Sequence, residues 1–305
     1  MIRFLIRRAV WIVITLWLVY TLSFFLMLAV PGGPMSGERS YPPEIEKMRK
    51  DRFHLNDPWP VQYWYYLSNA CRGDFLSSQV LNDFEVSEII AQGFPISATL
   101  GVLAMSMALI VGLSAGIVSA LWRNSLLDVF FRSMATIGIA VPNFVLAGLA
   151  IMVFVFQLKW FPAAGWGKPI DMVLPSICLA APFAAYISRL TRTGMLDVLG
   201  QDYIRTAYAK GLMPSTVVLK HAVRGALLPV VSYLGPAVAG VLTGSLVIER
   251  IFFLPGLGTH FIEAVTQRDY TTSLGIVMVS TALVLVMNTL VDISYQLLDP
   301  RIKLK

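Results

Sequence analysis

The sequence has little charge for its length. Of its 305 residues, 14% are charged and 56% are hydrophobic. This leaves more apolar side chains than a soluble core of this size can bury, so the composition excludes a soluble globular domain. The shortage of charge indicates a membrane protein, with the lipid bilayer as one of its partners.

Cysteine is also scarce. Cys71 lies in a polar region and Cys178 lies within an apolar stretch. The two thiols are therefore expected at different depths in the membrane, too far apart for the close approach that a disulfide needs. We expect both to be isolated thiols.

Residues for catalysis and for metal binding are missing as well. A phosphate-binding loop of the form G-x-x-x-x-G-K-[ST] is absent, since Gly165–Pro169 lacks the first glycine and ends in proline. His54, His221 and His260 are far apart, without metal-ligand spacing. The net charge of +6 shows no clustered basic face of the kind that binds nucleic acid. We therefore predict no catalytic residues, no metal site, no bound cofactor and no nucleic-acid partner.

What the sequence does have is long apolar stretches. A helix needs roughly 20 residues to cross about 30 Å of hydrocarbon. Six stretches approach or exceed this length, at residues 9–30, 96–121, 134–156, 173–188, 226–247 and 273–297. The fourth is short and contains Pro175 and Pro182, so we expect it to be kinked or sheltered by its neighbours. The fold class predicted is an all-α membrane protein with six transmembrane helices.

The distribution of Lys and Arg predicts the orientation, because cytosolic loops of membrane proteins are enriched in both. One set of polar segments holds Arg3, Arg7, Arg8, Arg123, Arg132, Arg189, Arg192, Arg205, Lys210, Lys220, Arg224, Arg301, Lys303 and Lys305. The two short loops of the other side hold only Lys159, Lys168, Arg250 and Arg268. Both termini are therefore expected in the cytosol. The first stretch is longer than a secretory signal and is expected to remain as a span.

The apolar stretches hold few carboxylates. Asp292 lies near the cytosolic end of the sixth, with Asn288 one turn before it. Ion-coupled carriers usually keep acidic residues deep in their spans, so one peripheral Asp argues against a self-sufficient secondary carrier. For Asp292 we favour a structural hydrogen bond between helices, and a role in transport stays open.

The longest polar region, residues 31–95, follows the first stretch and is expected outside the membrane. Its aromatic residues include Trp59 and Trp64. Such side chains often anchor a protein at headgroup depth, which is the favoured interpretation. The alternative is a surface that docks an external partner.

A polar segment between the fourth and fifth stretches has the composition of a short cytosolic helix. Asp202 suits its N-cap, Ala207 and Ala209 favour its interior, Lys210 suits its C-terminal end, and Gly211 can adopt the left-handed conformation that ends it. A second helix is expected from about Ser215. The first helix has the features of a docking element.

The segment from Arg205 to Pro229 resembles the permease signature of ABC importers, which reads Glu-Ala-Ala, three residues, Gly, nine residues, Ile, one residue, Leu-Pro. Arg205-Thr206-Ala207 stands in place of Glu-Ala-Ala, and Gly211 and Leu228-Pro229 are kept. The leading Arg and the five additional residues after the Gly are both features of the signature in the peptide-transporter branch, which this segment resembles. Further segments agree with the oligopeptide permease family: Arg7-Arg8, Pro31–Pro34, Gly37–Arg39, His54–Pro58, Gly73–Phe75, Thr243–Ser245, Leu254–Gly258, Arg268–Tyr270 and Leu298–Arg301.

This resemblance implies a type I ABC importer permease with the MetI-like fold in a bacterial cytoplasmic (inner) membrane. The implied partners are a second homologous permease, two cytosolic ATPase subunits that use ATP and Mg²⁺, an external peptide-binding protein and the peptide itself. The chain would not be an enzyme. The residues expected to couple it to an ATPase are Tyr203, Ile204, Arg205, Thr206, Ala207, Tyr208, Ala209, Lys210 and Gly211.

The sequence also suggests sites for the peptide and for the external protein. Asn143, Ser232 and Thr243 are expected to line the translocation path, whose wall is expected to carry small and hydroxyl side chains rather than charges. Trp59 and Trp64 are the candidates for docking the binding protein. The Gly37–Arg39 and His54–Pro58 segments favour oligopeptide as cargo. Dipeptides, nickel and glutathione remain alternatives within the family, and a membrane-anchored assembly protein is the alternative outside transport.

Three regions are expected along the chain. Residues 1–30 form a cytosolic stub and the first transmembrane helix, and residues 31–95 form the external loop region. Residues 96–305 form the permease core, with five helices and a cytosolic coupling loop at 189–225.

Overall fold

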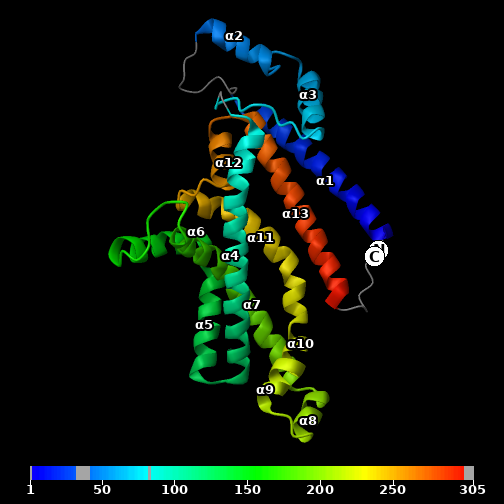
Figure 1. The fold of residues 1–305 in the computed structure, drawn as a ribbon, viewed down its shortest axis with the longest axis vertical. Coiled ribbons are helices and arrows are strands. Elements are labelled where there is room, and N and C mark those ends of the chain that lie inside the picture. The colour runs from blue at the N-terminus through cyan, green and yellow to red at the C-terminus, as the bar shows by residue number, and fades with distance from the viewer. Residues whose placement is uncertain (1, 32–41, 82–83, 299–305) are drawn as a thin grey trace. The chain divides into compact units, whose positions relative to one another are not determined.

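The chain is mainly helical in the part that the computed structural model describes, residues 2–31, 42–81 and 84–298. Outside its helices, a single isolated bridge joins Ser77 and Glu85 in this part of the chain. Figure 1 shows the order of α1 (Ile2–Ala29), α2 (Pro43–Arg52), α3 (Trp59–Cys71), α4 (Val86–Leu121), α5 (Leu126–Ala140), α6 (Asn143–Ala150), η1 (Ile151–Gln157), α7 (Pro169–Leu199), α8 (Asp202–Ala209), α9 (Pro214–Thr216), η2 (Val217–Ala222), α10 (Val223–Ala226), α11 (Leu228–Ile251), α12 (Leu257–Thr266) and α13 (Tyr270–Leu298).

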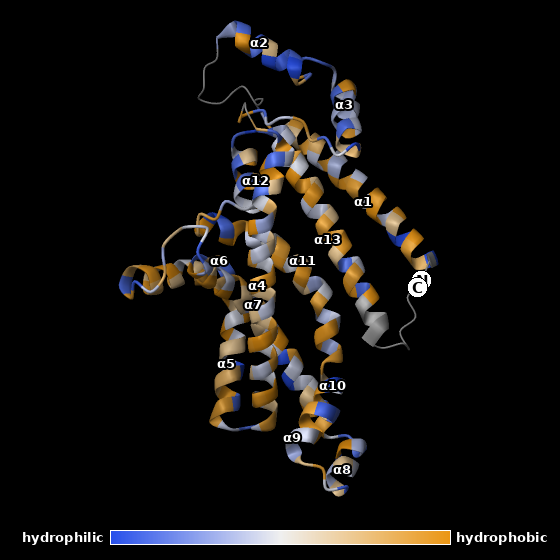
Figure 2. Cartoon of the chain, viewed as in Figure 1, coloured by the Kyte–Doolittle hydropathy of each residue, from blue (hydrophilic) through white to orange (hydrophobic). Residues whose placement is uncertain are grey.

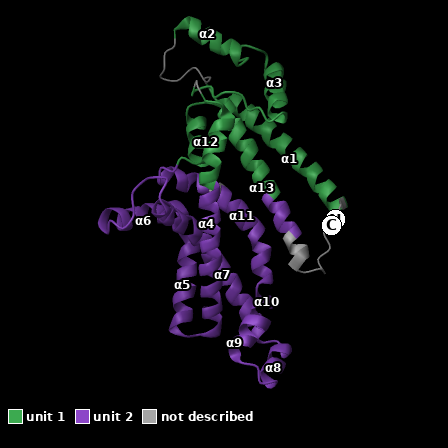
Figure 3. Ribbon diagram, viewed as in Figure 1, with its two compact units in different colours: residues 1–97, 255–286, 305 green, residues 98–254, 287–304 purple. Residues whose placement is uncertain are grey.

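Two compact units divide the chain (Figure 3). Unit 1 comprises residues 1–97 and 255–286, together with residue 305. Unit 2 comprises residues 98–254 and 287–304. The division expected from the sequence, into residues 1–30, 31–95 and 96–305, stays a prediction.

Five of the described helices are long and apolar enough to cross a membrane: α1, α4, α7, α11 and α13. Figure 2 shows hydrophobic residues along most of their length. They correspond to five of the six stretches expected from the sequence. The sixth candidate is the pair formed by α5 and α6–η1, which passes the same length and composition test only when its two halves are counted together.

The expectation of one continuous helix at residues 134–156 is wrong. α5 ends at Ala140, and the axes of α5 and α6–η1 differ by 107°. The cause is Pro142, which restricts the preceding residue to extended backbone; Val141 accordingly has φ −87° and ψ 121°. Pro142 then serves as the N-cap of α6. This candidate is therefore a broken span or a re-entrant segment.

The expectation of a short fourth span is also wrong. α7 has 31 residues, about 46 Å at the usual helical rise, and contains both Pro175 and Pro182. Hydropathy falls at Arg189, but the helix continues to Leu199, and neighbouring elements bury Thr191, Gly194 and Met195 along this extension. The second span likewise begins at Val86, ten residues before the expected start.

An aromatic cluster forms a core in unit 1. Tyr20 and Phe24 of α1 pack with Tyr63 and Tyr66 of α3 and with Leu274 of α13. The Tyr20 hydroxyl donates to the backbone oxygen of Tyr63 at 2.9 Å, and the two rings meet edge to face at 5.3 Å. The hydrogen bond and the edge-to-face contact hold α3 against α1, and the burial of the apolar rings stabilises the same arrangement.

Unit 2 is organised around α7, which packs against α5, α6, α10 and α11. Gly112 and Gly116 of α4 allow close approach to the same helix. A Cβ at Gly112 would lie 2.8 Å from the backbone oxygen of Ala184, and one at Gly116 would lie 2.6 Å from that of Ser188. These two glycines therefore serve packing within the chain.

Candidate coupling helix and membrane-facing sites

The helix α8 forms where the sequence predicts it. Gln201 is its N-cap, in extended backbone, so Asp202 is the first helical residue and makes no side-chain cap. The expectation that Asp202 caps the helix is wrong, although its carboxylate still favours the positive end of the helix dipole. The helix ends at Ala209, and Gly211 has φ +76° as predicted.

One face of α8 is buried within the chain. Ile204 is 1% exposed and Ala207 is 7% exposed. They belong to a cluster, hereafter the α8 core cluster, whose members come from α4, α7, α8, η2 and α10: Ala120, Met195, Ile204, Ala207, Val217, Val218, Ala222 and Ala226. The cluster holds α8 on the ends of the long helices of its unit, so α8 is not a loose loop segment.

The opposite face of α8 is free to meet a partner. Tyr203 is 50% exposed and Tyr208 is 45% exposed, and Arg205, Thr206 and Lys210 are exposed as well. Arg205 pairs with Asp202 at 3.6 Å, and both side chains are highly exposed. Such a pair contributes little to stability. Of the nine residues expected to couple to an ATPase, Ile204 and Ala207 therefore face the chain's own core. The other seven are exposed.

Ala207 is among the residues expected to couple to an ATPase, and a charge placed there would on that view enter the groove of the partner. Because Ala207 is buried against the α8 core cluster, the charge would instead enter the chain's own apolar core.

A buried ion pair lies in the same unit, between α5 and α7. The Arg192 guanidinium donates from Nε and Nη2 to the two oxygens of Asp128, at 2.7 and 2.8 Å. Ser119 Oγ and the Asn124 backbone N–H also donate to this carboxylate, at 2.6 and 2.9 Å. Asp128 has no exposed surface, and its four hydrogen bonds join α4, α5 and α7. We call this group the Asp128 clamp.

Sequence reasoning missed the Asp128 clamp. It counted Arg192 among the cytosolic loop charges, whereas the residue lies within α7. The signal for Asp128 was a capping pattern, with Ser125 at the N-cap of α5 and an acidic residue three positions later. The backbone N–H of Asp128 does donate to Ser125 Oγ at 3.3 Å. The pairing with Arg192 spans 64 residues and leaves no local pattern.

Two cavities lie along α5 in unit 2. The larger, about 610 Å³, has mostly apolar walls from α4, α5 and α7, such as Met107, Phe130 and Ile177. The smaller, about 370 Å³, has mixed walls, with apolar residues such as Phe131 and Ile139. We call it the polar cavity because seven of its eleven lining residues are polar: Ser119, Arg132, Thr136, Ser188, Arg189, Arg192 and Thr193.

Two of the three residues expected to line the translocation path, Asn143 and Ser232, are not among the lining residues of these cavities. Asn143 is the first residue of α6, immediately after the break at Pro142. Ser232 is exposed on α11, and its hydroxyl donates to the backbone oxygen of Leu228 at 3.1 Å. The side chain of Thr243 lies outside the described part of the structure. The assignment of these three residues to a path stays a prediction.

The two tryptophans proposed for docking differ in their surroundings. Trp59 opens α3 and packs against the Phe25 ring of α1, with 5.6 Å between ring centroids. Trp64 is 65% exposed, and its ring meets the neighbouring Tyr63 ring edge to face, with 5.4 Å between centroids. Trp59 therefore fits an anchor beside a membrane helix, and Trp64 fits an outer docking surface better.

A second buried carboxylate, Asp269, organises unit 1. Its oxygens accept from the backbone N–H groups of Gln79 and Thr272, each at 3.1 Å, and from the hydroxyls of Ser78, Thr271 and Thr272. We call this group the Asp269 hub. It attaches the chain that follows α3 to the start of α13.

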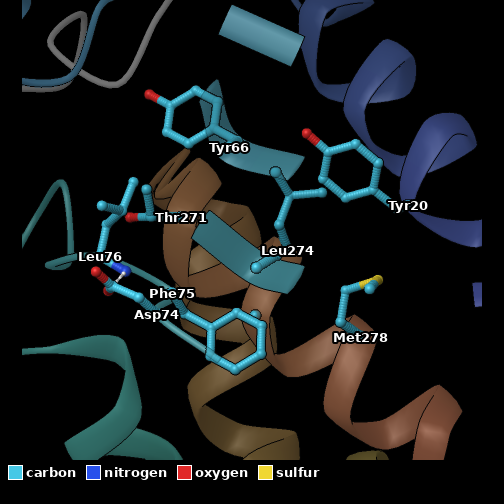
Figure 4. Close-up of a pocket in the computed structure, with 10 residues that line it drawn as sticks. Tyr20, Tyr66, Asp74, Phe75, Leu76, Thr271, Leu274 and Met278 are labelled. Carbon is cyan, nitrogen blue, oxygen red and sulfur yellow. Dashed lines mark hydrogen bonds between the residues drawn. The ribbon is translucent and has the colours of Figure 1, made fainter. Parts of the chain in front are cut away.

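The surroundings of the hub extend to the aromatic core. Gln79 Nε2 donates to the Tyr66 hydroxyl, which in turn donates to the backbone oxygen of Phe53. Burial raises the pKa of Tyr66 above its ordinary value, so the hydroxyl stays protonated as this donor. Figure 4 shows Tyr66 and Thr271 near Tyr20 and Leu274, around a cavity of about 20 Å³. This cavity has room for about one water molecule and is too small for a peptide.

Nothing in the described residues groups three or more His, Cys, Asp or Glu side chains as a metal site would require. Asp292 of α13 is half-buried and has an interaction partner. Asn288, one turn earlier, approaches Gly235 of α11. These contacts favour the structural interpretation of the two polar residues.

Five long apolar helices, with the short helix α8 between α7 and α11, are the architecture of a membrane protein. Comparison with known proteins gives the family. Residues 112–304 match the family of binding-protein-dependent transport system inner membrane components, and residues 1–101 match its N-terminal family. The chain belongs to this family.

Similar proteins cover the whole chain. The sequence is 45% identical to the dipeptide transport system permease DppB of Bacillus subtilis, over 100% of this chain and 99% of that protein. It is 42% identical to the oligopeptide transport system permease OppB of Escherichia coli K12, over 99% of this chain and 100% of that protein. The predicted resemblance to the peptide-permease family is confirmed.

Solved structures confirm the fold class. An inward-facing structure of the MetNI methionine ABC transporter matches with a TM-score of 0.58 at 15% identity, over 70% of this chain and 97% of that one. An amino acid ABC transporter matches with a TM-score of 0.52 at 17% identity, over 71% of this chain and 95% of that one. At these identities the likeness concerns the fold alone, and it is the MetI-like fold that the sequence predicts.

Proposed function

We propose that this chain is the permease subunit of an ATP-driven peptide importer and forms half of the translocation path. The observation that carries this proposal is the 42–45% identity, over the full length, to permeases named for dipeptide and oligopeptide transport. The missing phosphate-binding loop agrees with a subunit that leaves ATP chemistry to its partners.

The proposed assembly contains this chain, a second homologous permease, two cytosolic ATPase subunits that use ATP and Mg²⁺, and an external peptide-binding protein. This chain binds no cofactor of its own and is not an enzyme. It lies in a bacterial cytoplasmic membrane with both termini in the cytosol, as the Lys and Arg distribution favours.

Coupling to ATP hydrolysis is assigned to the outward face of α8. Tyr203, Arg205, Thr206 and Tyr208 would contact an ATPase subunit, while Ile204 and Ala207 attach α8 to the α8 core cluster. This cluster includes residues of α4 and α7, so a displacement of α8 is transmitted to both helices. The Asp128 clamp extends the connection to α5.

Peptide is the proposed cargo class, with oligopeptides favoured. Of the two segments that favour oligopeptide, Gly37–Arg39 lies outside the described residues. In the other, His54 Nδ1 and Asp57 Oδ2 are 2.7 Å apart and Gln62 Nε2 donates to the Asp57 backbone oxygen at 2.8 Å. This segment therefore forms a turn that leads into α3, so its residues serve local structure.

The test is uptake by proteoliposomes that contain the complete complex. Labelled peptides of two to six residues, nickel and glutathione are offered with and without ATP and binding protein. We expect ATP-dependent peptide uptake that vanishes without either ATPase or binding protein. Uptake by this chain alone would support a secondary carrier, and ATP-dependent uptake of nickel or glutathione without peptide would place the chain in another branch of the family.

A further inference from the structure

The polar cavity of unit 2 carries uncompensated positive charge. Three arginines line it, Arg132 from α5 and Arg189 and Arg192 from α7, and no carboxylate is among its lining residues. Asp128 neutralises Arg192. Arg132 has no ion pair within the described chain, and the guanidinium of Arg189 lies over the Tyr186 ring at 4.9 Å from its centroid.

These two free charges lie on helices that are candidates for membrane spans. Arg189 lies in α7, which is a candidate span by itself, and Arg132 lies in α5, which is a candidate only together with α6–η1. Charged side chains in such helices face a water-filled cavity or another polar group, because hydrocarbon does not solvate them. The hydroxyls of Thr136, Ser188 and Thr193 line the same cavity. It is therefore a polar surface suited to water and to an anion.

The two sides of α5 differ in character. Phe130 and Met134 line the apolar cavity, whereas Arg132 and Thr136 line the polar one. A charge that served only to orient the chain could lie on any face of α5 near its end. Instead Arg132 and Arg189, from two different helices, line one cavity of about 370 Å³.

We infer that this cavity is a subsite on the translocation path for the C-terminal carboxylate of the transported peptide. The inference rests on the proposed function. Guanidinium groups bind carboxylates through paired, charge-assisted hydrogen bonds. The terminal carboxylate is common to all peptides, so a cationic subsite for it does not select among side chains. It replaces the expectation that charges are absent from the path.

The test uses the complete reconstituted transporter and pairs of peptides that are identical except for a free carboxylate or an amide at the C-terminus. The variants are Arg132→Gln, Arg189→Gln and the double variant. Arg132→Lys and Arg189→Lys preserve the charge. Arg123→Gln is the matched control, because it removes an exposed cytosolic arginine that does not line the cavity.

We expect the double Gln variant to lower uptake of the free acid about tenfold, as loss of charged hydrogen bonds to a carboxylate requires. Uptake of the amide should change less than twofold, and the Lys variants and Arg123→Gln should stay near wild type. Any preference of the binding protein for one peptide of a pair is the same throughout, because the same binding protein serves every variant. This preference therefore cancels when the ratio of acid to amide uptake is compared between variants.

Three results would overturn the subsite. One is an equal loss for acid and amide, which means a structural role. Another is a loss that depends on the anionic lipid content of the vesicles and not on the peptide terminus, which assigns the arginines to a lipid phosphate. The third is unchanged uptake of both peptides. Failure of the proposed function is distinct, because the wild-type complex would then import neither peptide with ATP.

Discussion

The buried carboxylates of Asp269 in unit 1 and Asp128 in unit 2 are satisfied in different ways. Asp269 accepts from backbone N–H groups and hydroxyls, while Asp128 is paired with the guanidinium of Arg192. Hydroxyl groups can donate or accept, but a guanidinium can only donate and keeps its charge. The Asp269 hub can therefore adapt to a lost charge, and the Asp128 clamp cannot.

The largest effect is expected for Asp128→Asn. The amide keeps the size of the side chain but leaves Arg192, whose side chain is 19% exposed, without its counter-charge. Removing one partner of a buried ion pair should lower the unfolding free energy by about 3 kcal/mol. This is the lower end of the usual range, because the Arg192 side chain reaches the polar cavity and can be solvated there. Thermal unfolding of the purified complex measures this. Asp202→Asn, which alters an exposed pair, is the control and should stay near wild type; equal melting temperatures for both variants would contradict the clamp.

Ala207→Asp should cost somewhat less, about 2 kcal/mol, because α8 can partly detach to expose the new charge to water. We expect faster backbone amide hydrogen exchange in α8 and η2, and unchanged exchange in the other helices. Ala209→Asp is the matched control, since Ala209 is exposed on the same helix. If both variants exchange alike, Ala207 does not face the α8 core cluster.

Asp269→Asn should cost about 1–2 kcal/mol, less than Asp128→Asn. The remaining oxygen can still accept from the Gln79 and Thr272 amides, and the Thr272 hydroxyl can turn to accept from the new amide. Ser78 cannot fully adapt, because its hydroxyl already accepts from Val80 and Leu81. The melting temperatures of Asp269→Asn and Asp128→Asn, measured side by side, test this order. A larger decrease in melting temperature for Asp269→Asn would contradict the comparison of the two carboxylates.

The smallest effect on stability is expected for Gly211→Val. No atom crowds the position, so the cost comes from the left-handed backbone alone, about 1–2 kcal/mol for a β-branched residue and at the low end here since the turn is exposed. Peptide uptake should fall more than stability does, because the end of α8 would be misaligned. Gly200→Val is the control, at a glycine with φ −79°. Normal uptake by Gly211→Val at matched membrane levels would show that this turn does not align α8.

Hydropathy predicted the long helices well because lipid imposes their apolar length whatever their packing. It could not detect the break at Pro142, which lies inside an apolar run and acts only through the backbone of Val141. It also shortened α7, since a helix continues past Arg189 wherever its neighbours bury part of it.

The candidate site was predicted in position but not in orientation. The segment Asp202–Gly211 has the composition of a short helix, and α8 forms there. Which face turns inward depends on the α8 core cluster, whose members come from five elements. The Asp128 clamp was missed for the same reason, because long-range pairing leaves no local signal.

The central claim, that the outward face of α8 couples this permease to an ATPase, is tested most directly by Tyr208→Ala. Tyr208 is 45% exposed and lies outside the α8 core cluster, so its loss should leave the fold intact. The measurement is ATP-dependent peptide uptake by the reconstituted complex, beside its melting temperature and the amount of ATPase that copurifies. We predict a wild-type melting temperature with at least tenfold lower uptake and weaker ATPase retention, as expected for a buried aromatic contact at an interface. Wild-type uptake and ATPase retention in Tyr208→Ala would contradict the claim.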